Sequence, residues 1–244
     1  MHHETIDYLC GETELKGYLA YDESSEAKRP AVIVAHAWKG QDDFARQKAE
    51  ALAQLGYVGF AADVYGNGIE VETNEEAWAL MLPLFLDREL LRERINAAFT
   101  TLQNHPKVDP ASIGAIGFCF GGLTVIELLR SGADVSGVVS FHGVLGDTLN
   151  DQKANLAPNA DQITGSLLIL HGNDDPLVSH KDILSIQREF TNANVDWQMN
   201  IYGHSKHAFT NPEARDEKMG LVFNPVANMR SWLAMYNFFE EIFT

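Results

Sequence analysis

A glycine-rich turn at residues 117–122 constrains the fold of this chain more than any other stretch. It contains Cys119 within the sequence Gly-Phe-Cys-Phe-Gly-Gly. Small and apolar residues precede it at 112–116, and apolar residues at helical spacing follow from Leu123. This pattern predicts a strand, a sharp turn and a helix, in which the glycines prevent collisions around a strained central residue. The turn has the G-x-nucleophile-x-G form, with cysteine in the usual place of serine. A buried structural cysteine is the alternative interpretation.

Strand and helix patterns alternate on both sides of this turn. Residues 4–10 and 13–21 alternate apolar and polar side chains around a short turn, which predicts an antiparallel hairpin. Continuous apolar runs elsewhere predict strands that are buried on both faces, as in a parallel sheet. These further strands are expected at 31–35, 57–62, 112–116, 135–141 and 166–170. Residues 195–202 alternate apolar and polar side chains and predict one more strand.

Five helical segments are expected between and after these strands. Ser179 and Asp182 form a capping-box pattern, and Asn224 followed by Pro225 is typical of a helix start. The last helix is predicted to bury a face made of Val226, Met229, Leu233, Tyr236 and Phe243. The helices are expected from Asp43 to about Gly56, across 74–104 with a break near Pro83, at 123–130, from 180 to about 190, and from Asn224 onward.

Alternation of strands and helices predicts an α/β fold with a doubly wound, mostly parallel sheet. The N-terminal hairpin would add antiparallel strands at one edge. The chain has 244 residues, and we find no internal repeat, low-complexity tract or linker within it. A single domain over 1–244 is therefore the economical expectation.

Charge and cysteine content limit the partners of this chain. The formal net charge of −16 argues against nucleic acid or an anionic membrane surface, which need clustered lysine and arginine. The N-terminus resembles no signal peptide, and no apolar run is long enough to span a bilayer, so we expect a cytoplasmic location. Cys10 and Cys119 show no metal-binding or paired spacing. We predict no metal, no cofactor and a small-molecule partner; the sequence leaves monomer and homodimer open.

A thiol nucleophile needs a base, and the base needs a group that fixes its tautomer. In a doubly wound sheet such residues lie in loops after the carboxyl ends of strands. Two later loops carry them, at 171–176 and 203–209, and the order cysteine, aspartate, histidine is that of α/β-hydrolases. We favour Asp175 over Asp174 as the acid. We favour His207 over His204 as the base, because an apolar pair follows it.

Acyl transfer also requires donors that point at the developing oxyanion. The backbone amide of Phe120, after the nucleophile, and that of Trp38, after the first parallel strand, are the predicted donors. The histidines at 36, 142 and 171 each follow a strand and are more typical of buried, hydrogen-bonded side chains than of a direct catalytic role. Side chains expected to line the substrate pocket are Trp38, Lys39, Tyr65, His142 and Phe209.

From about residue 4 to 240, the chain resembles the dienelactone hydrolase family. The resemblance is carried by the turn at 117–122, the loop at 63–66, His142-Gly143, the segment 171–178 and the segment 207–209. It implies a hydrolase of esters or lactones in which Cys119, His207 and Asp175 match the catalytic positions.

Two positions depart from the family pattern. Ala37, which the resemblance places in the substrate-binding region, stands where the dienelactone enzymes have a glutamate that interacts with the resting cysteine. Asn211 stands where they have an arginine that holds the substrate carboxylate. Dienelactone itself is therefore an unexpected substrate, and a neutral or differently anchored ester, lactone or thioester fits at least as well. Whether Arg88 or Arg215 reaches the pocket is left open.

Two other functions compete with hydrolysis. A catalytically silent α/β-hydrolase scaffold, used for ligand binding or protein interaction, is consistent with the missing glutamate and arginine. A thiol redox function is the third possibility, but Cys119 has no resolving cysteine near it in sequence.

Overall fold

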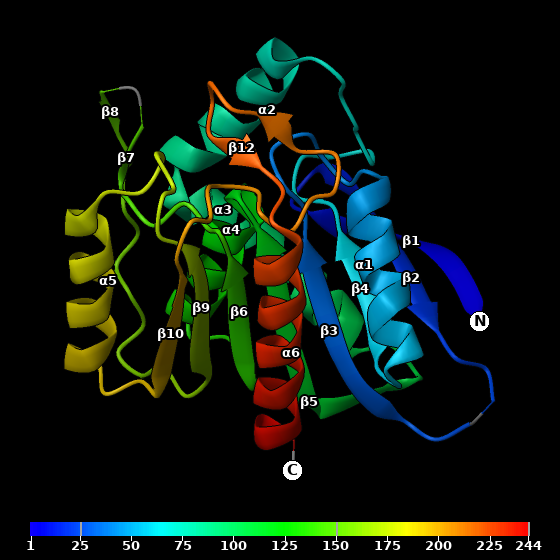
Figure 1. The fold of residues 1–244 in the computed structure, drawn as a ribbon. Coiled ribbons are helices and arrows are strands. Elements are labelled where there is room, and N and C mark those ends of the chain that lie inside the picture. Colours follow the sequence, from blue (N-terminus) through cyan, green and yellow to red (C-terminus); the bar gives the residue numbers. More distant parts are fainter. Residues whose placement is uncertain (25, 150, 244) are drawn as a thin grey trace.

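The computed structural model describes residues 1–24, 26–149 and 151–243. Among these residues, eight strands form one twisted sheet in the order β1-β2-β4-β3-β5-β6-β9-β10 (Figure 1). The six strands from β4 to β10 run parallel, whereas β1 pairs antiparallel with β2, and β2 pairs antiparallel with β4. This arrangement confirms the predicted fold class. The strands are β1 (His2–Cys10), β2 (Thr13–Tyr21), β3 (Arg29–Ala35), β4 (Val58–Ala62), β5 (Val108–Phe118), β6 (Gly137–Phe141), β9 (Ser166–Gly172) and β10 (Trp197–Tyr202).

Helices cover both faces of the sheet. In Figure 1, α1 (Asp43–Gln54) and α6 (Pro225–Ile242) lie in front of it, and α3 (Arg88–Gln103) and α4 (Phe120–Arg130) lie behind it. One apolar cluster fills the space on each side, so β3, β4 and β6 read as nearly unbroken apolar runs. The remaining helices are α2 (Asn74–Leu86), above the carboxyl edge, and α5 (His180–Asn192), at the β10 end.

Two short hairpins decorate the carboxyl side of the sheet. One, β7 (Thr148–Leu149) with β8 (Gln152–Lys153), lies in the connection between β6 and β9. The other, β11 (Arg215–Asp216) with β12 (Leu221–Val222), follows the histidine loop. Neither had a sequence signal, because a strand of two residues is too short to show a period.

The helical segment at 74–104 breaks as predicted, but about one turn after Pro83. Helix α2 includes Pro83 and ends at Leu86. The break comes at Asp87, which is extended and whose carboxylate accepts a hydrogen bond of 3.1 Å from the Leu90 amide at the start of α3. A proline removes one helical hydrogen bond, and packing of the buried Leu84 and Phe85 outweighs that loss. Asp87 ends one helix and caps the next.

The predicted buried face of α6 was wrong at three of its five positions, whereas Tyr236 and Phe243 pack against the core. Val226, Met229 and Leu233 are 49%, 65% and 58% exposed. The helix carries a second apolar stripe, and its aromatic pair gains more from burial than the smaller side chains do. The residues that α6 buries are Ala227, Ser231, Met235, Phe238 and Phe239. The capping box before α5 and the Asn224 cap before α6 are present as predicted.

Candidate active site

The turn after β5 holds Cys119 in a strained conformation. Its backbone has φ 56° and ψ −115°, a region that side-chain-bearing residues rarely adopt. The surrounding glycines permit this geometry, because a Cβ on Gly117 would lie 1.9 Å from the Gly121 oxygen. A Cβ on Gly121 would lie 2.1 Å from the Ala35 oxygen. The sequence therefore folds into the sharp turn that was predicted, with a half-buried thiol at its tip.

Tyr65 contacts both residues whose backbone amides are the predicted oxyanion donors. Phe120 is the first residue of α4, so its amide is one of those that have no partner within the helix. The Tyr65 hydroxyl donates a 2.9 Å hydrogen bond to the Trp38 carbonyl, and its ring stacks on Phe120 at 6.1 Å between centroids. Tyr65 lines neither of the cavities next to Cys119. The structure thus gives Tyr65 a supporting position beneath the site in place of the predicted contact with substrate.

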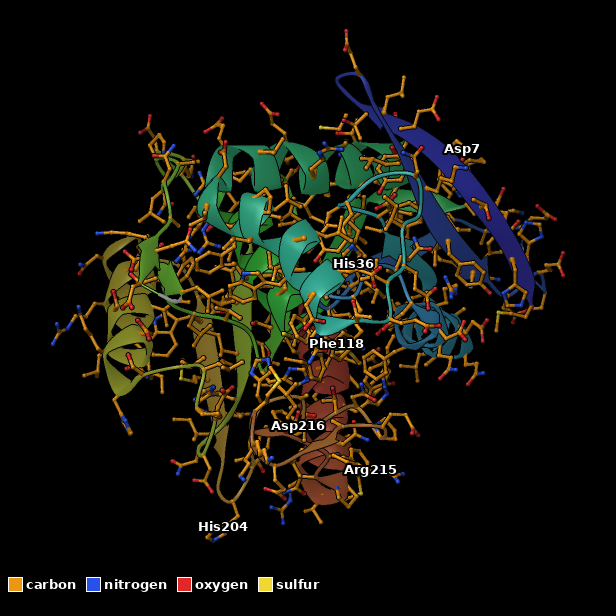
Figure 2. All side chains as sticks on the ribbon, turned by 90° about the horizontal axis from the view of Figure 1, so that it is seen from above. Asp7, His36, Phe118, His204, Arg215 and Asp216 are labelled. Carbon is orange, nitrogen blue, oxygen red and sulfur yellow. The ribbon has the colours of Figure 1, made fainter. Side chains whose placement is uncertain are left out.

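The structure brings His207 and Asp175 together. His207 Nδ1 lies 2.7 Å from Asp175 Oδ2, and both side chains are 0% exposed. The other carboxylate oxygen of Asp175 accepts a 2.8 Å hydrogen bond from the Leu177 amide, which fixes the carboxylate in place. The neighbouring alternatives point elsewhere: Asp174 is exposed, and His204 is exposed at the tip of its loop (Figure 2).

The charges around His207 favour its protonated form. Burial by itself lowers the pKa of this imidazole. The charge on the Cys119 sulfur and the hydrogen bond to Asp175 act in the opposite direction, and together they raise the pKa to about 10. The residues at this site thus place an imidazolium beside the Cys119 sulfur.

The other strand-end histidines are held neutral. Burial lowers the pKa of His142, His36 and His171. His142 Nε2 lies 2.8 Å from the Thr210 hydroxyl, and its ring is packed against Phe209. Phe209 is fully buried and lines neither cavity, so its predicted contact with substrate was wrong; it supports His142 from behind.

Two lobes of one cleft meet at Cys119. The apolar lobe has a volume of about 640 Å³ and lies beneath α2. The polar lobe has a volume of about 300 Å³ and includes His207 and His142. Both lobes share Trp38, Asn74, Cys119 and Leu221. The side chains found only in the apolar lobe are Glu75, Trp78, Met81, Val144, Leu149, Leu177 and Met219.

The polar lobe carries charges of both signs. Lys39 lines it as predicted, but its Nζ donates a 2.6 Å hydrogen bond to the Glu72 carbonyl. Arg215 also lines it, whereas Arg88 lies in a separate cavity. Asp42, Glu213 and Asp216 offset these two cations, so the lobe has no excess positive charge.

Several lining residues had no motif in the sequence. Trp78 and Met81 fall within a helix at ordinary apolar spacing, and Met219 and Leu221 lie in the hairpin after the histidine loop. Within the described residues, no cluster of three or more His, Cys, Asp or Glu side chains has metal-binding geometry. Within the same residues, no helix has both the length and the apolar character needed to cross a bilayer.

Comparison with known proteins identifies the family. The model of the dienelactone hydrolase family matches residues 15–243. This chain belongs to that family. Two solved structures superpose with a TM-score of 0.91, and each covers 100% of this chain and 99% of its own. One is named m3DLH, with 40% identity; the other is a dienelactone hydrolase-like promiscuous phosphotriesterase from metagenomic libraries, with 36% identity. A carboxymethylenebutenolidase homolog of Xenopus tropicalis is 23% identical, over 91% of this chain and 87% of that protein.

Within the dienelactone hydrolase family, the two departures noted in the sequence fall in one place. Ala37 and Asn211 both line the polar lobe. The lobe therefore lacks a carboxylate at residue 37 and a guanidinium at residue 211. His207 and Cys119 both line this lobe, and His207 is paired with the buried Asp175.

Proposed function

We propose that this member of the dienelactone hydrolase family cleaves small neutral esters or lactones through an acyl-Cys119 intermediate. The observation that supports the proposal is the buried pair of Asp175 and His207, which lies beside the Cys119 thiol where the two lobes meet. A base oriented by a carboxylate and adjacent to a thiol is the arrangement that nucleophilic acyl transfer requires.

In the proposed reaction, the Cys119 sulfur attacks the ester carbonyl carbon, and the carbonyl oxygen becomes an oxyanion. The amides of Phe120 and Trp38 donate hydrogen bonds to this oxygen. When the intermediate collapses, the carbon–oxygen bond to the alcohol breaks, and His207 Nε2 gives its proton to the leaving alkoxide. Water then transfers a proton to His207 and attacks the thioester, which releases the acid and restores the thiolate. Asp175 keeps the imidazole in the required tautomer throughout.

His207 supplies the activation of Cys119 in this scheme. The family glutamate is replaced by Ala37, so the resting thiol does not depend on a carboxylate at that position. The helix α4 begins directly after Cys119, and the partial positive charge at its N-terminus attracts negative charge at the sulfur. Both influences act on the free enzyme, before substrate binds.

The lobes indicate the kind of ester. The apolar lobe, walled by Trp38, Trp78 and Met81, suits an aliphatic or aromatic group. The polar lobe has balanced charges and does not offer a site for a free carboxylate. We therefore infer that uncharged esters with one apolar substituent are better substrates than esters that carry a second acid group.

Turnover of a series of p-nitrophenyl esters and aryl lactones tests the proposal. We expect Cys119→Ala to lower kcat by about a thousandfold or more. Cys10→Ala is the matched control, because Cys10 lies on β1 and lines neither lobe, and its turnover should equal that of the wild type. Equal turnover in Cys119→Ala and wild type would refute the mechanism. Absence of activity on every ester, with a thiol inert to iodoacetamide, would favour the silent scaffold.

A further inference from the structure

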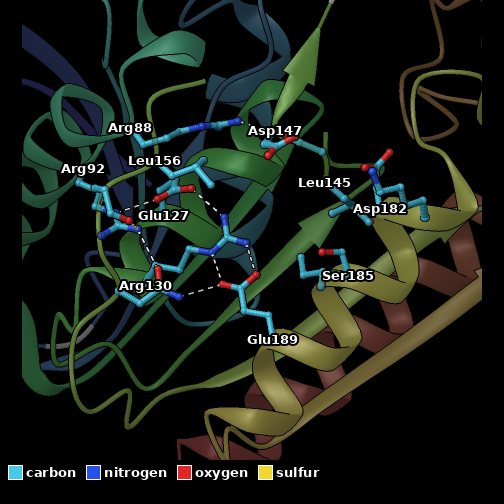
Figure 3. A pocket seen from close by; sticks show the side chains of 15 residues that line it. Arg88, Arg92, Glu127, Arg130, Leu145, Asp147, Leu156, Asp182, Ser185 and Glu189 are labelled. Carbon is cyan, nitrogen blue, oxygen red and sulfur yellow. Dashed lines mark hydrogen bonds and ion pairs between the residues drawn. The ribbon is translucent and has the colours of Figure 1, made fainter. Parts of the chain in front are cut away.

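A separate cavity of about 360 Å³ lies between α3, α4 and α5, and shares no lining residue with the catalytic cleft (Figure 3). Its wall is unusually rich in charged side chains. The cations are Arg88, Arg92, Arg130 and Lys181, and the anions are Glu127, Asp147, Asp182 and Glu189.

The carboxylates of this cavity already have partners. Glu127 contacts Arg92 and Arg130, both at 2.7 Å, and Glu189 contacts Arg130 at 2.7 Å (Figure 3). Asp182 accepts hydrogen bonds from Ser179 as part of the cap of α5. Asp147 lies 3.6 Å from Lys153 and accepts a 2.9 Å hydrogen bond from the Thr148 hydroxyl.

Arg88 is the buried cation of this cavity for which the described residues provide no ion pair. Its side chain is 1% exposed, and its Nη2 donates a 3.2 Å hydrogen bond to the Gly146 carbonyl. Its Nε and Nη1 are buried without any hydrogen-bond partner in the described part of the chain. These two nitrogens carry three of the five N–H donors of a guanidinium. The guanidinium lies over the Phe85 ring at 4.4 Å, and Glu127 and Asp147 attract it from a distance without a direct contact. Buried N–H donors that lack an acceptor are unfavourable, so the fold keeps Arg88 at a cost in stability.

We propose that this cavity binds a small oxyanion, a carboxylate or a phosphate group, with Arg88 as its principal donor. The planar guanidinium matches both groups, and the unpartnered N–H donors of Arg88 supply the hydrogen bonds. Lys181 lines the same cavity and forms no ion pair within the described residues, so it adds a second positive charge. The volume admits a small organic acid or phosphate ester. Burial lowers the pKa of Arg88 to about 10, which leaves it charged at neutral pH.

Entry of the anion requires a local change at Gly146. The Gly146 carbonyl is the acceptor that now holds Nη2, and the guanidinium itself is almost fully enclosed. The chain on either side of Gly146 belongs to the loop that leads to β7, outside the helices and the main sheet. A rotation of this carbonyl away from Arg88 would free Nη2 as a further donor beside Nε and Nη1, without disturbing the pairs made by Glu127.

Isothermal titration calorimetry of the full-length protein tests this site. Sodium phosphate and sodium acetate are titrated separately at pH 7.5, with ionic strength held constant by sodium chloride. We expect saturable binding of at least one of them, and the better of the two identifies the anion class. Arg88→Gln should weaken that binding by about tenfold or more, since a charge-assisted pair is lost. If neither anion binds saturably to the wild type, the proposal is overturned.

Arg94→Gln is the matched control. Arg94 is on the same helix and also has an unpartnered Nε and Nη1, but it does not line the cavity. The affinity of the Arg94→Gln variant for the anion should stay within about twofold of that of the wild type. Unchanged binding in Arg88→Gln would place the anion elsewhere and refute the proposal. If circular dichroism shows that Arg88→Gln does not fold, Lys181→Gln is the deciding variant, because this exposed position tolerates change. Anion binding about threefold weaker than that of the wild type supports the site. Anion binding equal to that of the wild type refutes it.

Discussion

Replacement of Asp175 by asparagine separates the charge of this carboxylate from its shape. The Leu177 amide donates to Oδ1 at 2.8 Å, so the asparagine should keep its oxygen there and turn its amide nitrogen toward His207. That nitrogen is a donor, and it would force Nδ1 to act as the acceptor and leave the imidazole proton on Nε2. His207 could then no longer accept a proton from Cys119.

The structure also sets the size of the effect. The contact of 2.7 Å joins two side chains that are 0% exposed, so Asp175 is the partner that sets the tautomer of His207. An amide in place of this carboxylate leaves the base in the wrong tautomer, and kcat should fall by about a thousandfold or more. KM should change little, because Asp175 lines neither lobe of the cleft.

Steady-state hydrolysis of p-nitrophenyl acetate measures this effect. Asp174→Asn is the matched control, since Asp174 is the exposed neighbour and makes its side-chain hydrogen bond to Asn173. Its kcat should stay within about twofold of the wild type. Thermal unfolding followed by circular dichroism checks that both variants are folded. A kcat for Asp175→Asn within a factor of about ten of the wild type would refute the role of Asp175, as would an equal loss in Asp174→Asn.

Three further outcomes follow from the same structure. Because the pKa of His207 is raised from 6.5 to about 10, the ion pair of His207 with Asp175 contributes its full stabilisation below pH 6.5. This stabilisation and kcat/KM should both decline as the pH rises through about 10. Urea unfolding midpoints and pH–rate profiles measure the two effects. Gly121→Ala places a Cβ 2.1 Å from a backbone oxygen and should lower the free energy of unfolding by about 1–3 kcal/mol, whereas Gly203→Ala, with open space around it, should not. Phe239→Ala should cost about 3–5 kcal/mol and Leu233→Ala under about 0.5 kcal/mol in denaturant titrations, and the reverse order would contradict the observed burial on α6.

The sequence predicts the framework of the site well because local rules govern it. Glycine spacing specifies the turn at Cys119, and the apolar runs place the acid and base loops at the same edge of the sheet. The neighbouring alternatives Asp174 and His204 could be set aside from the residues that follow Asp175 and His207. The structure then brings Asp175 and His207 into contact.

Predictions that depend on packing were less successful. The α6 sequence has two apolar stripes, and only the tertiary structure shows which of them is buried. Tyr65 and Phe209 were expected at the substrate, but both lie behind residues that line the cleft. The positions of Arg88 and Arg215 had no local signal, because they depend on how loops distant in sequence pack together.

The backbone at Cys119 has a consequence for the evolution of this chain. A residue with a side chain at φ 56° and ψ −115° costs about 1–3 kcal/mol, and glycine would relieve most of that strain. In a related chain that no longer needed a nucleophile, the gain in folding stability would therefore favour glycine at this position. The cysteine at this position therefore carries a cost in stability that glycine would avoid.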